Sequence, residues 1–450
     1  MRPSKPTINF LQGNIAKLLF LFTWPLIMGE ILQSLYNSVD SLVVGNFVSD
    51  TALAAVSICS TLSNLVISFF NGMSIGASVI VARSFGKGNQ EELVDAISVA
   101  ITYSVVLGVL LSGAGIIAAP ELIRLSGALP DVFGEAVIYL RIYLAGLMFT
   151  VIYNMGAGIL RAVGNANAPF TILLVTSILN VILDVVFVTI IPLGVAGVGV
   201  ATVIAQGISV FMVYREFKKM NSNIHIDLYK MLRQRDTVWE ISNIGFPSGV
   251  QGAVINFSNL FIWRYVNMFD SSVAVAGVGI AQRLDHFAAI PPKAFGSALA
   301  TFIGQNEGAK NHKRSKRGAR YTMWLSLACT MAISVILYTF ADVFVGLFNS
   351  SPDVISIGVD MMRVLVPFYG IMAIRELFLG ILRGYGDAHI PMVLSLAGMV
   401  GFRQLFLFFA MRRYHSLMVT YVGYPLAWGV TTLLLAGYYC FKSRIERHKG

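Results

Sequence analysis

Two acidic residues, Asp40 and Asp184, stand inside long apolar stretches in the first half of the chain. A carboxylate is costly in hydrocarbon, so it normally faces a cavity or a partner group. Two carboxylates that share a pocket of low dielectric constant cannot both ionise cheaply unless a cation sits between them. This is the chemistry of a site that exchanges H⁺ or Na⁺ for another solute. The alternative is that each acid pairs structurally with a neighbouring helix.

Further polar residues recur at helical spacing along five apolar stretches of the first half. Residues at i, i+3 or i+4, and i+7 lie on one face of a helix. We therefore expect the five faces to converge on one polar cavity. The polar sets are Glu30, Gln33, Asn37 and Asp40; Ser57, Ser60, Asn64, Ser68 and Asn71; Tyr139, Tyr143 and Asn154; Ser177, Asn180 and Asp184; and Thr202, Gln206 and Ser209.

These residues must be positioned by membrane-spanning helices, because the chain is too apolar for a water-soluble fold. Of its 450 residues 56% are hydrophobic and only 12% are charged, and the mean hydropathy is +0.72. Stretches of about 20 apolar residues are long enough to cross the bilayer as helices. The pattern predicts an all-α integral membrane protein with twelve transmembrane helices, centred near residues 30, 65, 105, 148, 181, 206, 252, 287, 332, 370, 400 and 430.

The chain also repeats itself with a constant offset of 222 residues. Residues 159–169 read ILRAVGNANAP and residues 381–391 read ILRGYGDAHIP, and the same offset links Pro25 to Pro247. We expect two pseudo-symmetric bundles of six helices each, an N-terminal lobe at 1–222 and a C-terminal lobe at 223–450. An even number of helices per half places both halves in the membrane in the same orientation. Asp40 and Asp184 correspond to Ile262 and Phe406, so the acidic site is expected only in the first lobe.

Basic residues predict the orientation of the chain. Lys and Arg are concentrated in the termini and in the segments on one side of the expected helices, which places both termini in the cytoplasm. The net charge of +10 is therefore mainly a topology signal. The basic run at 310–320 is expected to meet anionic lipid or to fix orientation rather than to bind nucleic acid. We expect a multi-pass protein of a prokaryotic cell membrane that functions as a monomer.

The second half carries charges of a different kind inside its apolar stretches. Some of them are expected to pair across helices, and a structural role is an even alternative for Arg283, Asp285 and Arg403. Nearby acids are too few to neutralise every base, so Lys293 and Arg375 are expected to line a cavity. The set is Arg283, Asp285, His286, Lys293, Arg375, Glu376 and Arg403.

Specific motifs resemble those of the MATE (multidrug and toxic compound extrusion) transporters, over nearly the whole chain. In the first half they are Gln33, Tyr36-Asn37-Ser38-Val39-Asp40, Val44-Gly45, Leu53-Ala54-Ala55-Val56, Gly76 and Val81-Ala82-Arg83-Ser84-Phe85-Gly86. In the second half they are Gly296-Ser297-Ala298 and Gly304-Gln305-Asn306-Glu307-Gly308-Ala309. The resemblance implies a MATE-like fold, alternating access, and export of organic compounds in exchange for H⁺ or Na⁺.

Within that family the chain is more similar to the DinF-like branch, which uses a site in the N-terminal lobe. The acids of that site match Asp40 and Asp184, its amides match Asn154 and Asn180, and its hydroxyls match Tyr139 and Thr202. A further amide of the family is Ala157 here. The NorM-like branch relies on acids in the second lobe, where this chain has Ile255 and Met372, with Glu376 one turn away.

The sequence thus predicts a secondary antiporter for amphipathic organic compounds, most readily cationic drugs or toxins. Asp40, Asp184, Asn180 and Thr202 are expected to bind the coupling H⁺ or, as ligands, Na⁺. Tyr36, Asn37, Tyr139, Asn154, Lys293 and Arg375 are expected to bind the substrate. No other cofactor is expected.

Three alternatives to a drug antiporter remain open. The nearest is a flippase for lipid or lipid-linked oligosaccharide of the same superfamily. A membrane-embedded enzyme acting on lipid intermediates and a passive receptor are more remote, because the sequence shows no Walker, HExxH or GxSxG motif and the acids would lack a purpose.

Overall fold

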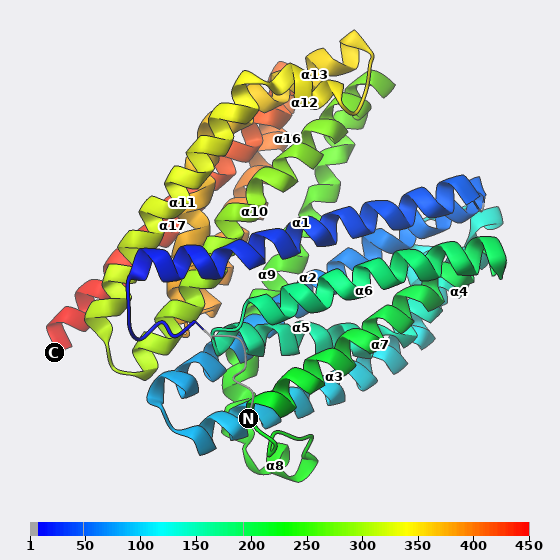
Figure 1. The fold of residues 1–450 in the computed structure, drawn as a ribbon. Coiled ribbons are helices and arrows are strands. Elements are labelled where there is room, and N and C mark those ends of the chain that lie inside the picture. Colours follow the sequence, from blue (N-terminus) through cyan, green and yellow to red (C-terminus); the bar gives the residue numbers. More distant parts are fainter. Residues whose placement is uncertain (1–7, 48, 192, 450) are drawn as a thin grey trace. The chain divides into compact units, whose positions relative to one another are not determined.

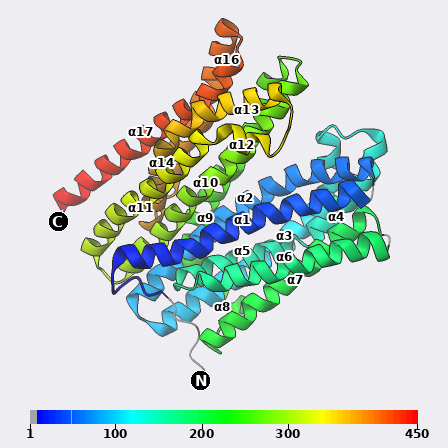
Figure 2. The ribbon, with the colours of Figure 1, turned by 45° about the horizontal axis from the view of Figure 1, so that its top comes forward.

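The computed structural model describes residues 8–47, 49–191 and 193–449, with the side chains of 36–47, 50 and 445–449 left undescribed. Within these residues every regular element is helical. The chain divides into two compact units, the first formed by Met1–Asn9 and Trp24–Gly249 and the second by Phe10–Thr23 and Val250–Gly450. Figures 1 and 2 follow the chain through these units.

The first unit is a bundle built around the neighbouring helices α4 and α5. Helix α5 packs against α2 and α3, α4 packs against α2, α3 and α7, and α6 packs against α7. The elements of this part of the chain are α1 (Ile15–Phe47), α2 (Asp50–Lys87), α3 (Gln90–Leu125), α4 (Pro130–Ala145), α5 (Leu147–Ala162), α6 (Asn167–Val185), η1 (Val186–Ile190), α7 (Val195–Met220), α8 (Leu228–Arg233) and α9 (Arg235–Asn267).

In the second unit α10 is the central helix. It packs against α11, α13 and α14, and α14 packs in turn against α11 and α17 (Figure 2). The elements are α10 (Ser272–Gly308), α11 (His312–Thr339), α12 (Ala341–Gly346), α13 (Pro352–Leu365), η2 (Val366–Phe368), α14 (Tyr369–Gly384), α15 (His389–Leu396), η3 (Ala397–Phe402), α16 (Arg403–Tyr414) and α17 (Leu417–Lys449).

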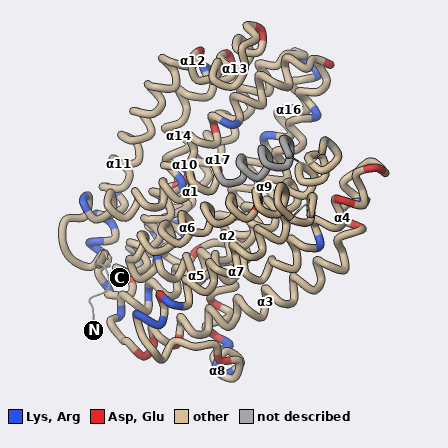
Figure 3. The backbone as a smooth tube through the Cα atoms, turned by 45° about the vertical axis from the view of Figure 1, so that its right-hand side comes forward, with Lys and Arg blue, Asp and Glu red and all other residues tan. Residues whose placement is uncertain are grey.

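The lengths and composition of these helices suit a membrane. Ten described spans are long and apolar enough to cross it, and the pair α4 and α5, bent by 44°, makes an eleventh. Helix α9 is 33 residues long but more polar than these spans. It is the remaining one of the twelve predicted transmembrane helices. Figure 3 shows that Lys, Arg, Asp and Glu gather near helix ends and leave long uncharged stretches between them. The predicted all-α membrane fold is confirmed.

Helix caps repeat with the same offset of 222 that the sequence shows. The Ser49 hydroxyl accepts a hydrogen bond from the amide of Ala52 at 3.0 Å, and the Ser271 hydroxyl accepts one from the amide of Ala274 at 3.1 Å. Both are N-caps, which satisfy amides that have no acceptor within the helix. The duplicated sequence therefore starts equivalent helices by the same local chemistry.

Helix ends repeat in the same way after α5 and α14. Gly164 and Gly386 adopt left-handed backbone conformations, with φ of 86° and 78°. The amide of Gly164 donates to the carbonyl of Arg161 at 2.9 Å, and that of Gly386 donates to the carbonyl of Arg383 at 2.8 Å. Only glycine adopts this conformation without a steric penalty, so each turn ends its helix at a fixed residue.

The segment between the repeats, which contains α8, belongs to the first compact unit because it is bound to α3. The Asp95 carboxylate on α3 pairs with the Lys230 ammonium on α8, and the amide of Asp227 donates to the Thr102 hydroxyl at 3.0 Å. The amide of Lys230 donates to the Asp227 carboxylate at 2.9 Å and lowers the pKa of that carboxyl below its usual 3.8. The boundary of the first compact unit therefore follows these contacts with α3 rather than the boundary of the sequence repeat. The predicted lobes, 1–222 and 223–450, stay a prediction.

Two helices, α1 and α9, contribute residues to both compact units. The division falls between Thr23 and Trp24 in α1 and between Gly249 and Val250 in α9. A proline lies close to each division, Pro25 in α1 and Pro247 in α9. A proline inside a helix removes one backbone hydrogen bond and weakens the helix at that point.

Candidate functional site

A cavity of about 180 Å³ lies inside the first unit. Six helices line it: α1, α2, α4, α5, α6 and α7. Its wall is mostly neutral and polar, with three tyrosines and no lysine, arginine, aspartate or glutamate among the described residues. The lining residues are Gln33, Val56, Ser60, Ser63, Asn64, Ile67, Tyr139, Tyr143, Thr150, Tyr153, Asn154, Leu173, Thr176, Ser177, Thr202, Ala205 and Gln206.

The predicted convergence of the polar faces is seen in this cavity, because each of the five sets contributes at least one residue. The contributing residues are Gln33, Ser60, Asn64, Tyr139, Tyr143, Asn154, Ser177, Thr202 and Gln206. Other members lie outside the lining: the Ser57 and Ser68 hydroxyls donate to the carbonyls of Leu53 and Asn64, each at 2.7 Å. A serine that bonds its own helix in this way does not need a cavity.

Several lining residues were not singled out from the sequence. Ser63, Thr150, Tyr153 and Thr176 all line the cavity. Each lies next to a recognised position or one turn away from it, so a wider helical face would have found them. The hydroxyl of Ser209 donates to that of Thr176 at 3.1 Å and joins α7 to α6 behind the wall.

The predicted ion-coupling residues divide into three groups. Thr202 lines the cavity, and its hydroxyl donates to the carbonyl of Val198 at 3.1 Å. Asp184 and Asn180, one turn apart on α6, are fully buried and lie outside the cavity lining. The side chain of Asp40 lies outside the described residues, so the predicted carboxylate pair and its Na⁺ or H⁺ site stay a prediction.

The predicted substrate-binding residues divide in the same way. Tyr139 and Asn154 line the cavity, and the Asn154 amide donates to the carbonyl of Thr150 at 2.9 Å. The side chains of Tyr36 and Asn37 lie outside the described residues. No described group of three or more His, Cys, Asp or Glu side chains could hold a metal ion.

In the second unit four of the predicted charged residues, Asp285, Lys293, Arg375 and Glu376, lie near one another. Arg375 on α14 donates to the Glu376 carboxylate at 2.5 Å and contacts the Met399 sulfur at 2.9 Å. Asp285 lies near the Tyr369 hydroxyl and near Lys293 and Arg375. Arg375 thus has a nearly buried ion-pair partner, and Lys293 is exposed. Their substrate role stays a prediction.

Arg403 is an almost fully buried cation that is held by neutral groups. Its guanidinium donates to the Ser258 hydroxyl and to the Asn259 amide oxygen, both at 2.9 Å. It also lies over the Tyr424 ring at 5.6 Å from the centroid. Arg403 is thus held by hydrogen bonds and a cation–π contact rather than by the ion pair that was one expectation for it. Arg283 and His286 are exposed on α10.

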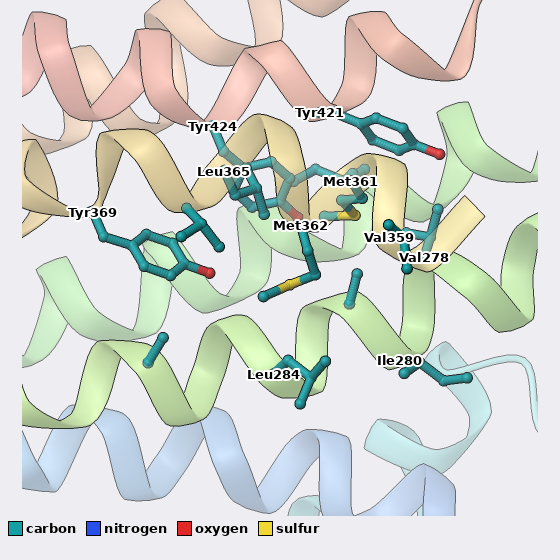
Figure 4. Packing of buried hydrophobic residues seen from close by; sticks show 14 of the residues in the cluster. Val278, Ile280, Leu284, Val359, Met361, Met362, Leu365, Tyr369, Tyr421 and Tyr424 are labelled. Carbon is teal, nitrogen blue, oxygen red and sulfur yellow. The ribbon is translucent and has the colours of Figure 1, made fainter. Parts of the chain in front are cut away.

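The repeat places larger side chains in the second unit at two positions that line the cavity of the first. At an offset of 222, Thr202 corresponds to Tyr424 and Gln206 to Trp428, so smaller groups in the first unit are replaced by larger ones. Tyr424 and Trp428 belong to the buried hydrophobic cluster of the second unit, which also contains Tyr369. Figure 4 shows Tyr369 and Tyr424 packed among Leu365, Met361 and Met362.

The fold and the cavity together define the class of this protein. Two units of packed, membrane-length helices, one with a polar internal cavity, are those of a multi-pass membrane transporter. Residues 25–186 and 247–408 both match the MatE family, and the chain belongs to it. The two matched segments differ by the same offset of 222. Because this is a family of transporters, the expectation that the chain is not an enzyme is confirmed.

Known relatives cover most of the chain. Probable multidrug resistance protein YpnP of Bacillus subtilis (strain 168) is 29% identical over 388 residues, which are 86% of this chain and 86% of that protein. Probable multidrug resistance protein YoeA of the same organism is 26% identical over 448 residues, 97% and 96% of the two chains. A crystal structure of MATE in complex with MaL6 has the same fold, with a TM-score of 0.90, 23% identity and coverage of 99% and 100%.

Proposed function

We propose that this protein is a secondary antiporter that exports amphipathic organic cations in exchange for H⁺ or Na⁺. The observation that carries the proposal is the cavity of the first unit, where polar faces of six helices converge. Amides and hydroxyls supply hydrogen bonds, and Tyr139, Tyr143 and Tyr153 supply aromatic faces that attract a cation. The names of the two Bacillus relatives support multidrug export and do not favour the flippase alternative.

The size of the cavity indicates which state of the cycle it fits. Sites for drug-sized compounds occupy about 300 to 1,000 Å³, whereas this cavity measures about 180 Å³. A volume of this size suits water or a desolvated ion better than a multidrug substrate. We propose that it is the contracted state, and that bending of α1 at Pro25 and of α9 at Pro247 widens it.

Coupling is assigned to Asp40 and Asp184, with Asn180 and Thr202 as neutral partners. The deep burial of Asp184 supports the assignment, since a buried carboxylate favours uptake of H⁺ or of a cation. Binding of the ion neutralises the site and favours the contracted state, which releases the substrate. The proposal also includes cytoplasmic termini, a monomeric unit and no cofactor apart from the ion.

Reconstitution into liposomes tests the proposal. Efflux of ethidium is measured while a pH gradient and a Na⁺ gradient are imposed separately, and acceleration by one of them identifies the ion. Asp184→Asn and Asp40→Asn should abolish that acceleration. Asp131→Asn is the matched control, because Asp131 is an exposed carboxylate in the first turn of α4. Full gradient-driven efflux by Asp184→Asn, in protein of normal yield and helicity, would refute the coupling role.

A further inference from the structure

A second cavity, of about 410 Å³, lies within the second unit where α1 begins beside α11. Its wall combines the backbone at the start of α1 with three arginines and a tyrosine from the first turns of α11. The lining residues are Gly13, Asn14, Ile15, Ala16, Arg314, Arg317, Arg320 and Tyr321. Figure 3 shows Lys and Arg gathered at this end of α11.

One side of this cavity, which we call the α1–α11 pocket, is held firmly in place. The Arg314 guanidinium donates to the carbonyls of Phe10 and Gly13, each at 2.8 Å. The Phe10 ring is fully buried and packs edge-on against Phe22 and Phe302, with centroids 5.0 and 5.2 Å away. The pocket is therefore a built feature, because its wall is tied to α11 through the chain that precedes α1.

The other two arginines are available for a ligand. Arg317 and Arg320 are exposed and form no ion pair or hydrogen bond with any described residue. None of the described lining residues is acidic, and the sequence of residues 1–7 contains no aspartate or glutamate. The first amides of α1 also lack acceptors within their own helix, as in any helix, and favour negative charge nearby. The charge of the pocket therefore favours an anion.

The depth of the pocket indicates the source of the anion. The apolar span of α1 begins at Ile15, which lines the pocket, so the pocket lies where hydrocarbon gives way to headgroups. Tyr321 and Trp324, one turn apart on α11, are half or more exposed, as expected of aromatic side chains at a membrane interface. At this depth, beside aromatic and apolar side chains, the phosphate of a lipid headgroup matches the surroundings better than a free anion does.

We propose that the α1–α11 pocket binds the phosphate of an anionic phospholipid headgroup. Arg317 and Arg320 contact the phosphate oxygens, Tyr321 lies against the glycerol region, and the acyl chains follow the exposed apolar surface of α1 at Phe20 and Leu21. The bound lipid stabilises the start of α1 against α11. The proposal is independent of the transported substrate and of the coupling ion.

Binding of lipid to the purified full-length protein tests this site. Native mass spectrometry in neutral detergent counts retained phosphatidylglycerol and phosphatidylcholine, and titration gives their dissociation constants. A basic residue near an anionic surface contributes about fivefold in affinity, so Arg317→Gln with Arg320→Gln should weaken phosphatidylglycerol binding about 25-fold. Lys313→Gln with Lys316→Gln is the matched control, since it removes the same charge from exposed positions of α11 outside the pocket.

The outcomes distinguish a specific lipid site from general attraction between anionic lipid and basic side chains. Loss confined to the arginine pair, with phosphatidylcholine bound weakly by every variant, supports the proposal. Competition by inorganic phosphate at similar concentration would support the anion site but assign it to a free phosphate. Equal loss in the lysine control, or no preference of the wild type for phosphatidylglycerol, would overturn the proposal. Circular dichroism and gel filtration confirm that each variant is folded.

Discussion

Gly380 lies where α14 crosses α10, and its replacement by alanine tests how closely these helices must approach. A β-carbon built on Gly380 would lie 2.3 Å from the carbonyl oxygen of Gly296 and 3.1 Å from its α-carbon. Ordinary van der Waals contact begins at 3.4 Å, so the overlap is about 1 Å. Both opposing atoms belong to backbone, so no change of rotamer relieves it, and the two helices must move apart. Small residues allow such close approach between membrane helices.

The expected cost follows from two opposing terms. Overpacking of a close contact costs about 1 to 3 kcal/mol, and a clash with backbone belongs at the upper end of that range. Alanine is the better helix former by about 1 kcal/mol. Gly380→Ala should therefore destabilise the protein by about 2 kcal/mol, which for a unit of this size lowers the unfolding temperature by roughly 4 to 8 °C.

Thermal unfolding in detergent, followed by intrinsic fluorescence, measures the effect. The matched control is Gly437→Ala in α17, because a β-carbon there meets no atom within 4 Å. Gly437→Ala should leave the unfolding temperature unchanged or raise it slightly. The same temperature for both variants would show that the α10–α14 crossing tolerates the extra carbon, and the reasoning from backbone distance would be refuted.

Three further predictions concern the buried Arg403, the cavity of the first unit and helix α8. Arg403→Gln should destabilise the second unit by about 1 to 3 kcal/mol, because the Asn259 amide oxygen loses its donor and the Ser258 hydroxyl, which also accepts from Gln404, loses one of two. A similar shift for the exposed Arg412→Gln in thermal unfolding would contradict this. Ala205→Trp should fill the cavity and stop ethidium efflux, whereas Ile204→Trp, outside the lining, should not. Equal efflux by the two variants would exclude the cavity from the transport pathway. Asp227→Ala should speed tryptic cleavage within α8 at neutral pH, and cleavage at the wild-type rate would contradict the role of the cap. The stabilisation by this cap, present above the usual pKa of 3.8, should be lost as the pH falls through the lower folded value, which hydrogen exchange of the Lys230 amide measures against Asp227→Ala.

The periodic features of the chain were predictable because they depend on local chemistry. Apolar length predicts the helices, and the duplicated stretches 159–169 and 381–391 form equivalent helix ends at Gly164 and Gly386. The positions of polar residues on helical faces predicted most of the cavity wall. The apolar stretch around Asp184 predicts its burial, but the sequence does not show that this residue lies outside the wall that Thr202 helps to form.

The sequence by itself determined the twelve helices and their duplication. It determined these because helix formation and membrane insertion depend on nearby residues and on composition. Only the tertiary structure decided which polar faces enclose space. Thr202 borders a cavity while its repeat partner Tyr424 fills a core, and this difference depends on the volumes of side chains from several helices. The α1–α11 pocket likewise exists only because Phe10 and Gly13 dock against Arg314, some 300 residues away, a contact that no local pattern contains.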